Sequence, residues 1–406
     1  MRRSSRSILT TVVIALFAAA GVGVAAPTPA ASAATPAAAT FVGTRSVATP
    51  AAGGERIYVA TNGTDLLPNG KRRQYCLDTG DRSSSCPAPT ADRPLRTVQT
   101  AIRIAAAGDV IVVRSGTYEE QLGWGARAGS STKPIVFQSA PGERVVIAGF
   151  LQLRSAHYWR VQGLRFTYSA AKTTGEAIVR LVGGRNWTFA NNEVYGTRGV
   201  ANILIREDTA SNSSDAARRA AAPQNYTVAG NCVRSQNGTA AHGLNHNIYL
   251  MPTIWSSGGL IERNLLTGAP TGSNIKASGS SDANGSPRNV TIRYNTMLYS
   301  ASGVITGLKS EGIEIVSNVV AKQQNGDRWD AAMKTYQGQY SNRIGFKDNL
   351  VSGFAKFLQQ PAGEKPVYTA RNVTPSSLSL TGSVANCSVR LADPALAAKY
   401  GVQFAG

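Results

Sequence analysis

The amino-acid sequence predicts an all-β fold, a parallel β-helix in which short strands wind into stacked coils. The first observation is a repeat of an apolar residue, two variable residues, an Asn, one further residue and usually another apolar residue. Successive repeats lie 23 to 39 residues apart, which suits one coil of a solenoid with loops of varying length. The others are strand-like alternation of apolar and polar residues and the lack of a long helical pattern after about residue 110. The repeat residues are Asn192, Asn231, Asn264, Asn295, Asn318, Asn349 and the degenerate Asn372.

These asparagines are interpreted as structural. At a tight bend, Asn tolerates the left-handed backbone region and can bond to the backbone of a neighbouring coil. Coils stack about 4.8 Å apart, so that identical side chains can form a ladder. Between the Asn segments we expect a second set of short strands, at 202–206, 246–250, 273–277, 302–306, 331–335 and 355–359.

The N-terminal residues are expected to lie outside the fold. Basic residues, an apolar run and a small-residue cleavage motif predict a secretory signal over residues 1–33, with an uncleaved membrane anchor as the alternative. Residues 34–54 are rich in Pro, Ala and Thr and are predicted to be a flexible lead-in. A single domain is predicted over residues 55–406 and, after signal cleavage, we expect a secreted monomer with no membrane segment.

The domain is expected to begin with a cap over residues 55–120. A strand at 57–65 precedes an amphipathic helix at 94–109, which would cover the open end of the β-helix before the first buried strand at 110–120. A C-terminal tail follows from about residue 375. In an oxidising compartment, Cys76 and Cys86 are expected to pair, and Cys232 and Cys387 form a second pair only if that tail folds back.

The opening of the domain resembles the pectate-lyase-like superfamily of right-handed parallel β-helix proteins, which includes secreted bacterial polysaccharide lyases. The resemblance is carried by "IYVATNGTD", "RPLRTVQTAIRIAAAGDVIVVRSGTYEE", "KPIVFQSAPGERVVIAG" and "HYWRVQGLRF", and the Asn coils extend it to about residue 374. It implies the fold more specifically than the activity, because hydrolases, epimerases, tail spikes and adhesins share the architecture.

One outer sheet face is the candidate functional face. Aligning "NILIR", "HNIYL" and "SNIKA" on their Asn-Ile pairs turns the Ile residues inward. The same alignment places on the outer face Asn202, Asn247, Asn274, Leu204, Tyr249, Lys276, Arg206, Met251 and Ser278. Lys334 is expected beside this column, across an intervening Ile305, and Lys309 just beyond a strand.

This basic, hydroxyl-bearing face suits an acidic sugar polymer, and the resemblance implies β-elimination with Lys or Arg as the base and often Ca²⁺ to neutralise the uronate. We expect Lys276 as the base, since a neighbouring cation and burial would lower its pKa. Tyr249 would be the proton donor or a stacking surface, and Arg206 a carboxylate ligand. Further substrate-binding candidates are Asn247, Asn274, Lys309 and Lys334.

The histidines in "AHGLNHNIYLM" have two interpretations. His242 and His246 could act as an acid or base or bind a sugar hydroxyl, or they could be hydrogen-bonded turn residues. The chain has only three His, and no Cys or His ligand spacing accompanies them, so no zinc site is predicted. No cofactor is firmly indicated. Asp327 and Asp330 could hold Ca²⁺, act as an acid-base pair, or cap a strand.

The charge points to a polyanionic partner. The formal net charge is +19, and it falls to +16 when the three signal arginines are removed. The cations are spread along the chain without a nucleic-acid-binding motif, so an acidic polysaccharide is expected rather than a specific nucleic acid. The alternatives are a non-catalytic β-helix that binds a wall or host polyanion through the same face and, with few placed carboxylates, a glycoside hydrolase.

Overall fold

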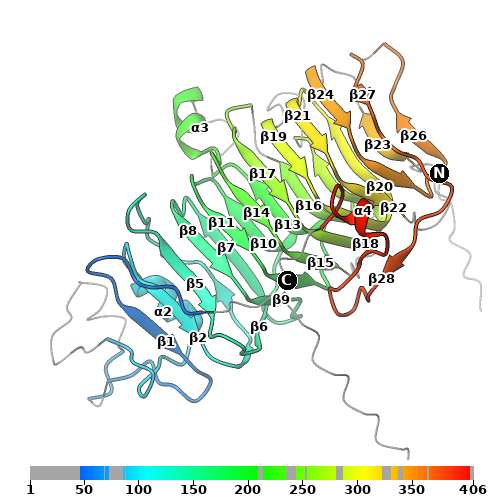
Figure 1. Ribbon diagram of the computed structural model, residues 1–406. Helices are drawn as coiled ribbons and strands as arrows, with labels where there is room; N and C mark the ends of the chain where they lie inside the picture. Colours follow the sequence, from blue (N-terminus) through cyan, green and yellow to red (C-terminus); the bar gives the residue numbers. More distant parts are fainter. Residues whose placement is uncertain are drawn as a thin grey trace, which may run out of the picture. The chain divides into compact units, whose positions relative to one another are not determined.

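The computed structural model describes residues 46–67, 69–72, 86, 88–208, 214–234, 244–251, 254–279, 287–321, 331–336, 342–363 and 365–402. The predicted signal lies outside these residues, as do Cys76, His242, Asp327 and Asp330. The chain divides into Met1–Ala38 and Ala39–Gly406, and the second unit is a right-handed parallel β-helix with a short N-terminal capping helix, as predicted (Figure 1). None of the described helices is long and apolar enough to span a membrane.

The first face of the β-helix is an 11-stranded sheet of strands that pair in parallel from coil to coil. Its strands alternate core and solvent residues, as in β17, where Ile261 is buried and Glu262 is partly exposed. In order, they are β1 (Arg56–Val59), β2 (Val110–Val113), β5 (Ile135–Ser139), β8 (Trp159–Gln162), β11 (Thr188–Ala190), β14 (Thr227–Ala229), β17 (Gly259–Glu262), β19 (Arg288–Arg293), β21 (Glu311–Val316), β24 (Asn342–Lys347) and β27 (Tyr368–Ala370).

A second sheet bends to make the other two faces, which we call the second and third faces. The second face carries β3 (Gly116–Tyr118), β6 (Val145–Ala148), β9 (Arg165–Thr167), β12 (Glu193–Tyr195), β15 (Cys232–Arg234), β22 (Val319–Ala321) and β25 (Leu350–Ser352). The third face carries β4 (Gln121–Leu122), β7 (Phe150–Arg154), β10 (Ala177–Val182), β13 (Ala201–Arg206), β16 (His246–Met251), β23 (Ala331–Tyr336) and β26 (Lys356–Gln359). The long strands β18 (Leu265–Ala277) and β20 (Thr296–Gly307) run through the bend and belong to both.

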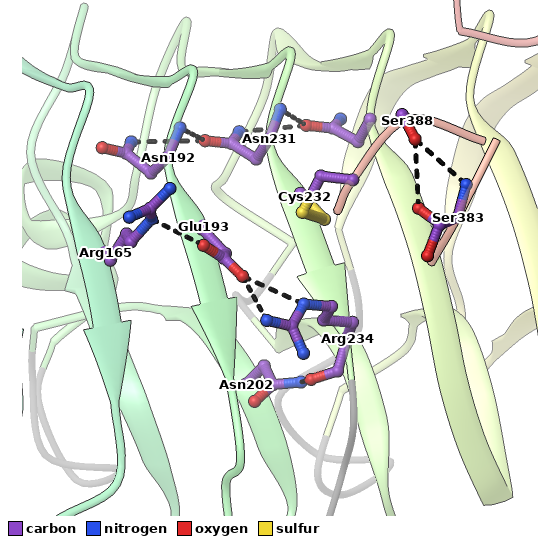
Figure 2. Close-up of a disulfide and its surroundings, with 11 residues drawn as sticks. Arg165, Asn192, Glu193, Asn202, Asn231, Cys232, Arg234, Ser383 and Ser388 are labelled. Atoms are coloured by element: carbon purple, nitrogen blue, oxygen red, sulfur yellow. Dashed lines mark hydrogen bonds and ion pairs between the residues drawn. A yellow bond between two sulfur atoms is a disulfide. The ribbon is translucent and has the colours of Figure 1, made fainter. Parts of the chain in front are cut away.

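The repeated asparagines form the predicted ladder at the corner between the first and second faces (Figure 2). Asn231 is typical: its Nδ2 donates to the carbonyl of Phe189 in the preceding coil and to Oδ1 of Asn264 in the next, both at 2.9 Å. Its backbone N–H also donates to that Oδ1. The left-handed residue is the one before each ladder Asn, such as Arg263 at φ 52° and Ser317 at φ 57°, and not the Asn itself. The ladder prediction is therefore confirmed, but the backbone role falls to the neighbouring residue.

A second polar ladder lies at the corner between the second and third faces. Asn202 Nδ2 donates to Asn247 Oδ1 at 3.0 Å, Asn247 Nδ2 to Asn274 Oδ1 at 2.7 Å, and Asn274 Nδ2 to Ser300 Oγ at 2.9 Å. All four residues are fully buried. The expectation that Asn247 and Asn274 face outward and bind substrate is wrong, because the chain bends at the start of each third-face strand and strict alternation does not hold there.

The predicted cap helix is present but shorter than its sequence pattern, as α2 (Val98–Ile104). Glu120 accepts from the backbone N–H groups of Val98 and Gln99, so the first turn of the helix is satisfied by a carboxylate. Residues 46–54, predicted as part of the lead-in, are held against the cap: Ala48 N–H donates to Gln138, and Ala51 N–H to the carbonyl of Gly108. The ordered domain therefore begins before residue 55.

The C-terminal tail folds back onto the outer side of the second face, and Cys232 is bonded to Cys387 as the second predicted pair (Figure 2). Tail residues such as Leu378 and Val389 cover an apolar column of Cys232, Leu265 and other second-face residues. The tail carries the antiparallel strands β28 (Leu380–Thr381) and β29 (Arg390–Leu391) and helix α4 (Pro394–Ala397). The remaining described helix, α3 (Asp215–Ala221), lies in the loop after β13. Cys86 is disulfide-bonded too.

Candidate functional site

The third-face strands from β7 to β26 stack in parallel register, and their outer side carries a continuous row of side chains, one from each coil. Cα registers between neighbouring strands define it, and inward neighbours such as Ile248, Ile275 and Val304 belong to the core. The row follows the β-helix axis, with rungs about 4.8 Å apart. We call it the outer row: Gln152, Arg180, Leu204, Tyr249, Lys276, Ile305, Lys334 and Gln359.

Tyr249 and Lys276 are adjacent in the outer row, as predicted from the Asn-Ile alignment. The Nζ of Lys276 lies 4.6 Å from the centroid of the Tyr249 ring. Lys276 is 9% exposed and Tyr249 7%. Burial lowers the pKa of Lys276 from 10.5 to about 8, because an ammonium group loses hydration there. The structure thus brings a phenol and a lysine that titrates near neutral pH into contact.

His246 lies on the same side of the sheet as Tyr249, and their ring centroids are 5.2 Å apart in an edge-on arrangement. The backbone N–H of Ser273 donates to Nδ1 of His246 at 3.2 Å, with the Ser273 hydroxyl 2.9 Å from the same nitrogen. An accepting Nδ1 assigns the proton of a neutral ring to Nε2. His246 is fully buried and lies beside Tyr249, where its ring is hydrogen-bonded to Ser273.

Arg206 does not adjoin Lys276. It pairs in register with Met251, which is two residues beyond Tyr249, and Lys276 lies a further coil away. The two Cα atoms are thus about 12 Å apart by coil spacing and strand rise. Arg206 instead lies near Arg180, whose pKa is lowered by burial; the charge of Glu176 raises that pKa, and the charge of Arg206 lowers it to a smaller extent. At this distance Arg206 and Lys276 would not contact the same sugar, and the role of Arg206 as a carboxylate ligand stays a prediction.

The two other lysines differ in position. Lys334 lies in the outer row two coils beyond Lys276, with Ile305 between them as expected, and it is 6% exposed. Lys309 lies four residues past Ile305, exposed in the turn after β20 at φ 65°. Lys334 therefore shares the row with Lys276, whereas Lys309 is at the margin of the face.

Arg180 is the charged member of the outer row that the sequence alignment missed; the other two are Gln152 and Gln359. Its strand "AIVRLV" lacks the Asn-Ile pair on which the later coils were aligned, but simple alternation of the strand would have placed Arg180 outward. Its guanidinium lies over the Phe150 ring at 4.5 Å and donates to the carbonyl of Thr174. Ser273 was likewise missed, because nothing in its local sequence signals the contact with His246.

Among the described residues, no group of three or more His, Cys, Asp or Glu side chains is placed to bind a metal ion. Asp327 and Asp330 lie outside that part of the chain. Calcium dependence therefore stays a prediction, and the chemistry below is derived from the chain's own cations.

Comparison with known proteins supports the fold. No family model matches the chain. A segment of 109 residues, 27% of the chain, is 31% identical to the uncharacterized protein YwoF of Bacillus subtilis (strain 168) but spans only 19% of that protein. The crystal structure of pectate lyase Pel9A is similar over 81% of this chain and 80% of its own, with a TM-score of 0.50 and 13% identity. An alginate lyase from Paenibacillus sp. str. FPU-7 matches over 69% of this chain and 96% of its own, with a TM-score of 0.43 and 15% identity. At 13% identity the likeness to pectate lyase Pel9A shows a shared parallel β-helix fold, and the chemistry has to be argued from the site.

Proposed function

We propose that this protein is a secreted lyase that cleaves a uronate-containing acidic glycan by β-elimination on the third face. The observation that carries the proposal is the contact of Lys276 with Tyr249, in which burial lowers the pKa of the lysine to about 8. A base of that pKa is unprotonated in roughly a tenth of molecules at pH 7 and in half at pH 8. The amine of Lys276 and the hydroxyl of Tyr249, which both suit proton transfer, thus lie close enough to act on the same glycosidic bond.

In the proposed reaction, Nζ of Lys276 takes the proton on C5 of the uronate. The C5–H electron pair forms the C4–C5 double bond, the bond from C4 to the glycosidic oxygen breaks, and the hydroxyl of Tyr249 protonates that oxygen. The step is redox-neutral and leaves a lysinium and a phenolate, and proton exchange between them or with water restores the resting state. His246, edge-on to the Tyr249 ring, is a positioning residue for the phenol.

Binding of an acidic chain is attributed to the cations on either side of this pair. Arg206 lies two coils before Lys276 and Lys334 two coils after it, each offset by about 10 Å along the axis. Cations at this spacing attract a polyanion lying along the row. Signal cleavage, export and a monomeric state belong to the same proposal. The disulfide supports export, because such bonds persist in oxidising compartments.

A second candidate is a β-helix that binds an acidic glycan without cleaving it. The observation in its favour is that the Tyr249 hydroxyl already lies 3.5 Å from the carbonyl of Gly279, an acceptor that would compete with a leaving oxygen. This function uses the same row and requires no proton transfer.

The test is turnover of uronate polymers, followed by the ultraviolet absorbance of the unsaturated product. Lys276→Met should abolish product formation with a melting temperature within a few degrees of the parent, whereas Lys133→Met, an exposed lysine on an N-terminal loop, should change neither. Tyr249→Phe removes one oxygen and should lower kcat at least tenfold, with exposed Tyr299→Phe as its control. Binding without turnover on every polymer favours the second candidate, and full activity of Lys276→Met excludes the proposed base.

A further inference from the structure

The N-terminal part of the third face carries three arginines, of which only one forms an ion pair with a carboxylate in the part of the chain that the structure describes. Arg154 and Arg206 are two coils apart in one column, with Val182 between them, and Arg180 is a rung of the outer row. Arg154 is matched by Asp208, with nitrogen–oxygen distances of 2.7 and 2.8 Å. Among the described residues, no carboxylate forms an ion pair with Arg180 or Arg206. Two guanidinium groups are therefore held on one face without a bonded carboxylate from these residues, although the exposed Glu176 acts on Arg180 through its charge.

Contacts with three neighbouring residues hold the guanidinium group of Arg180 in place. One Nη donates to the carbonyl of Thr174, the other lies 3.5 Å from Oε1 of Gln152, and the plane covers the Phe150 ring. The Nε atom is buried and has no hydrogen-bond partner in the described structure. Gly175 allows this arrangement, since a Cβ at that position would overlap the guanidinium. A cation held by neutral groups keeps its charge available for an anion.

The second guanidinium is near enough to act on the first. Arg206 lies one coil after Arg180 and two residues further along the strand, so that their Cα atoms are about 8 Å apart. Burial is the main cause of the lowered pKa of Arg180; the exposed Glu176 raises that pKa, and the repulsion from Arg206 lowers it by a smaller amount. Both arginines are partly exposed, so that solvent and ligands can reach them. Repulsion of this kind costs free energy in the empty protein and is relieved when an anion binds between the two groups.

We propose that Arg180 and Arg206 form an anion subsite for the carboxylate or sulfate of a sugar two to three units from the bond that Lys276 acts on. The inference deepens the proposed function and rests on the glycan lying along the outer row. Arg206 precedes Lys276 by two coils and Arg180 by three, and one coil spacing of about 4.8 Å is close to the length of one sugar in an extended chain. The subsite thus requires a substrate that carries negative charge beyond the sugar at which it is cleaved.

The experiment measures binding in the Lys276→Met background, where no substrate is consumed. The probes are a hexamer of galacturonate, sulfated dextran, neutral dextran and a galacturonate dimer that is too short to span both positions. Arg206→Gln should weaken binding of the hexamer about tenfold, equivalent to about 1.4 kcal/mol, and leave the dimer unchanged. Arg180→Gln should act in the same direction, and Arg180→Lys, which keeps the charge but loses the planar fork, should recover part of the affinity. Sulfated dextran and the hexamer distinguish a sulfate from a carboxylate ligand.

The matched control is Arg154→Gln, which removes an arginine from the same column as Arg206 but one already paired with Asp208. It should change affinity less than twofold. Equal losses of affinity in Arg154→Gln and Arg206→Gln would show that only the net charge of the face matters, and this would overturn the subsite. Hexamer affinity that is unchanged in both Arg180→Gln and Arg206→Gln would overturn it too. If Lys276→Met retains turnover while Arg206→Gln still weakens binding, the catalytic proposal fails and the subsite stands.

Discussion

Replacement of Asn264 by Ala measures what the asparagine ladder contributes to stability. The change removes four hydrogen bonds from a fully buried site. Two donors lose their acceptor, namely the backbone N–H and the Nδ2 of Asn231, both 2.9 Å from Asn264 Oδ1. The carbonyl of Val228 and Oδ1 of Asn295 lose a donor, also at 2.9 Å. Each stranded buried group costs about 1–3 kcal/mol, and neighbouring groups relax together, so we expect a loss of about 3–5 kcal/mol.

The control is Asn372→Ala at the last rung of the same ladder. Asn372 makes the same types of bonds, to Phe346 and Asn349, but it is partly exposed. Water can therefore replace its hydrogen bonds, and the expected loss is about 1 kcal/mol. Urea unfolding followed by circular dichroism gives both values, provided that the m-value is unchanged. Equal losses in the two variants would refute the argument that burial of the ladder sets its contribution.

Three further outcomes are expected. The rate of β-elimination should rise with pH through an inflection near pH 8 and level off above it, because burial lowers the pKa of Lys276 to about 8 and only the neutral amine accepts a proton. A pH–rate profile that is flat from pH 6 to 9 contradicts this prediction. Gly230→Ala should lower the free energy of unfolding by about 1–3 kcal/mol in urea, because Gly230 has φ 63° and an added Cβ would overlap Asn191. The control is Ser317→Ala at an equivalent turn, for which the free energy of unfolding should change little. Replacing both Cys232 and Cys387 by Ala should lower the free energy of unfolding by up to about 5 kcal/mol, since the bond closes a loop of 155 residues. The same change should speed proteolysis of the C-terminal tail. An unchanged urea midpoint would show that packing alone holds the tail in place.

Much of the fold was predictable because the coil repeats the same physical problem at each turn. A buried corner exposes the same backbone groups in successive coils, and Asn satisfies them through the same bonds, which is why the repeat is visible in the sequence. The pairing of Tyr249 with Lys276 was predictable for a related reason, since Ile248 and Ile275 mark equivalent core positions one coil apart. The cap helix followed from its apolar face.

The errors arose where the chain turns between faces. Alternation assumes a straight strand, but each third-face strand starts at a bend, so that Asn247 is buried beside the equally buried Ile248. The same bend leaves His246 on the side of Tyr249. Sequence pattern also misses contacts made across coils by residues without a repeated neighbour, such as Ser273 with His246. The placement of His246, Ser273 and Asn247 therefore depends on corner geometry that the sequence pattern does not contain.

The outer row is informative about function because the needs of the core do not explain its residues. Most inward positions of the same strands are Ile, Leu, Val, Ala or Met, as packing requires, with buried Thr306 and Thr335 as exceptions. A sheet face that served only solubility would keep its lysines in water, where an ammonium costs nothing. Lys276 and Lys334 are instead at most 9% exposed, and burial of a cation raises the free energy of the folded state unless another interaction offsets it. For Lys276 the same burial lowers the pKa to about 8, which is the property a general base requires. The cost in stability and the chemical advantage thus have one cause, which supports the proposed role of Lys276 as a base.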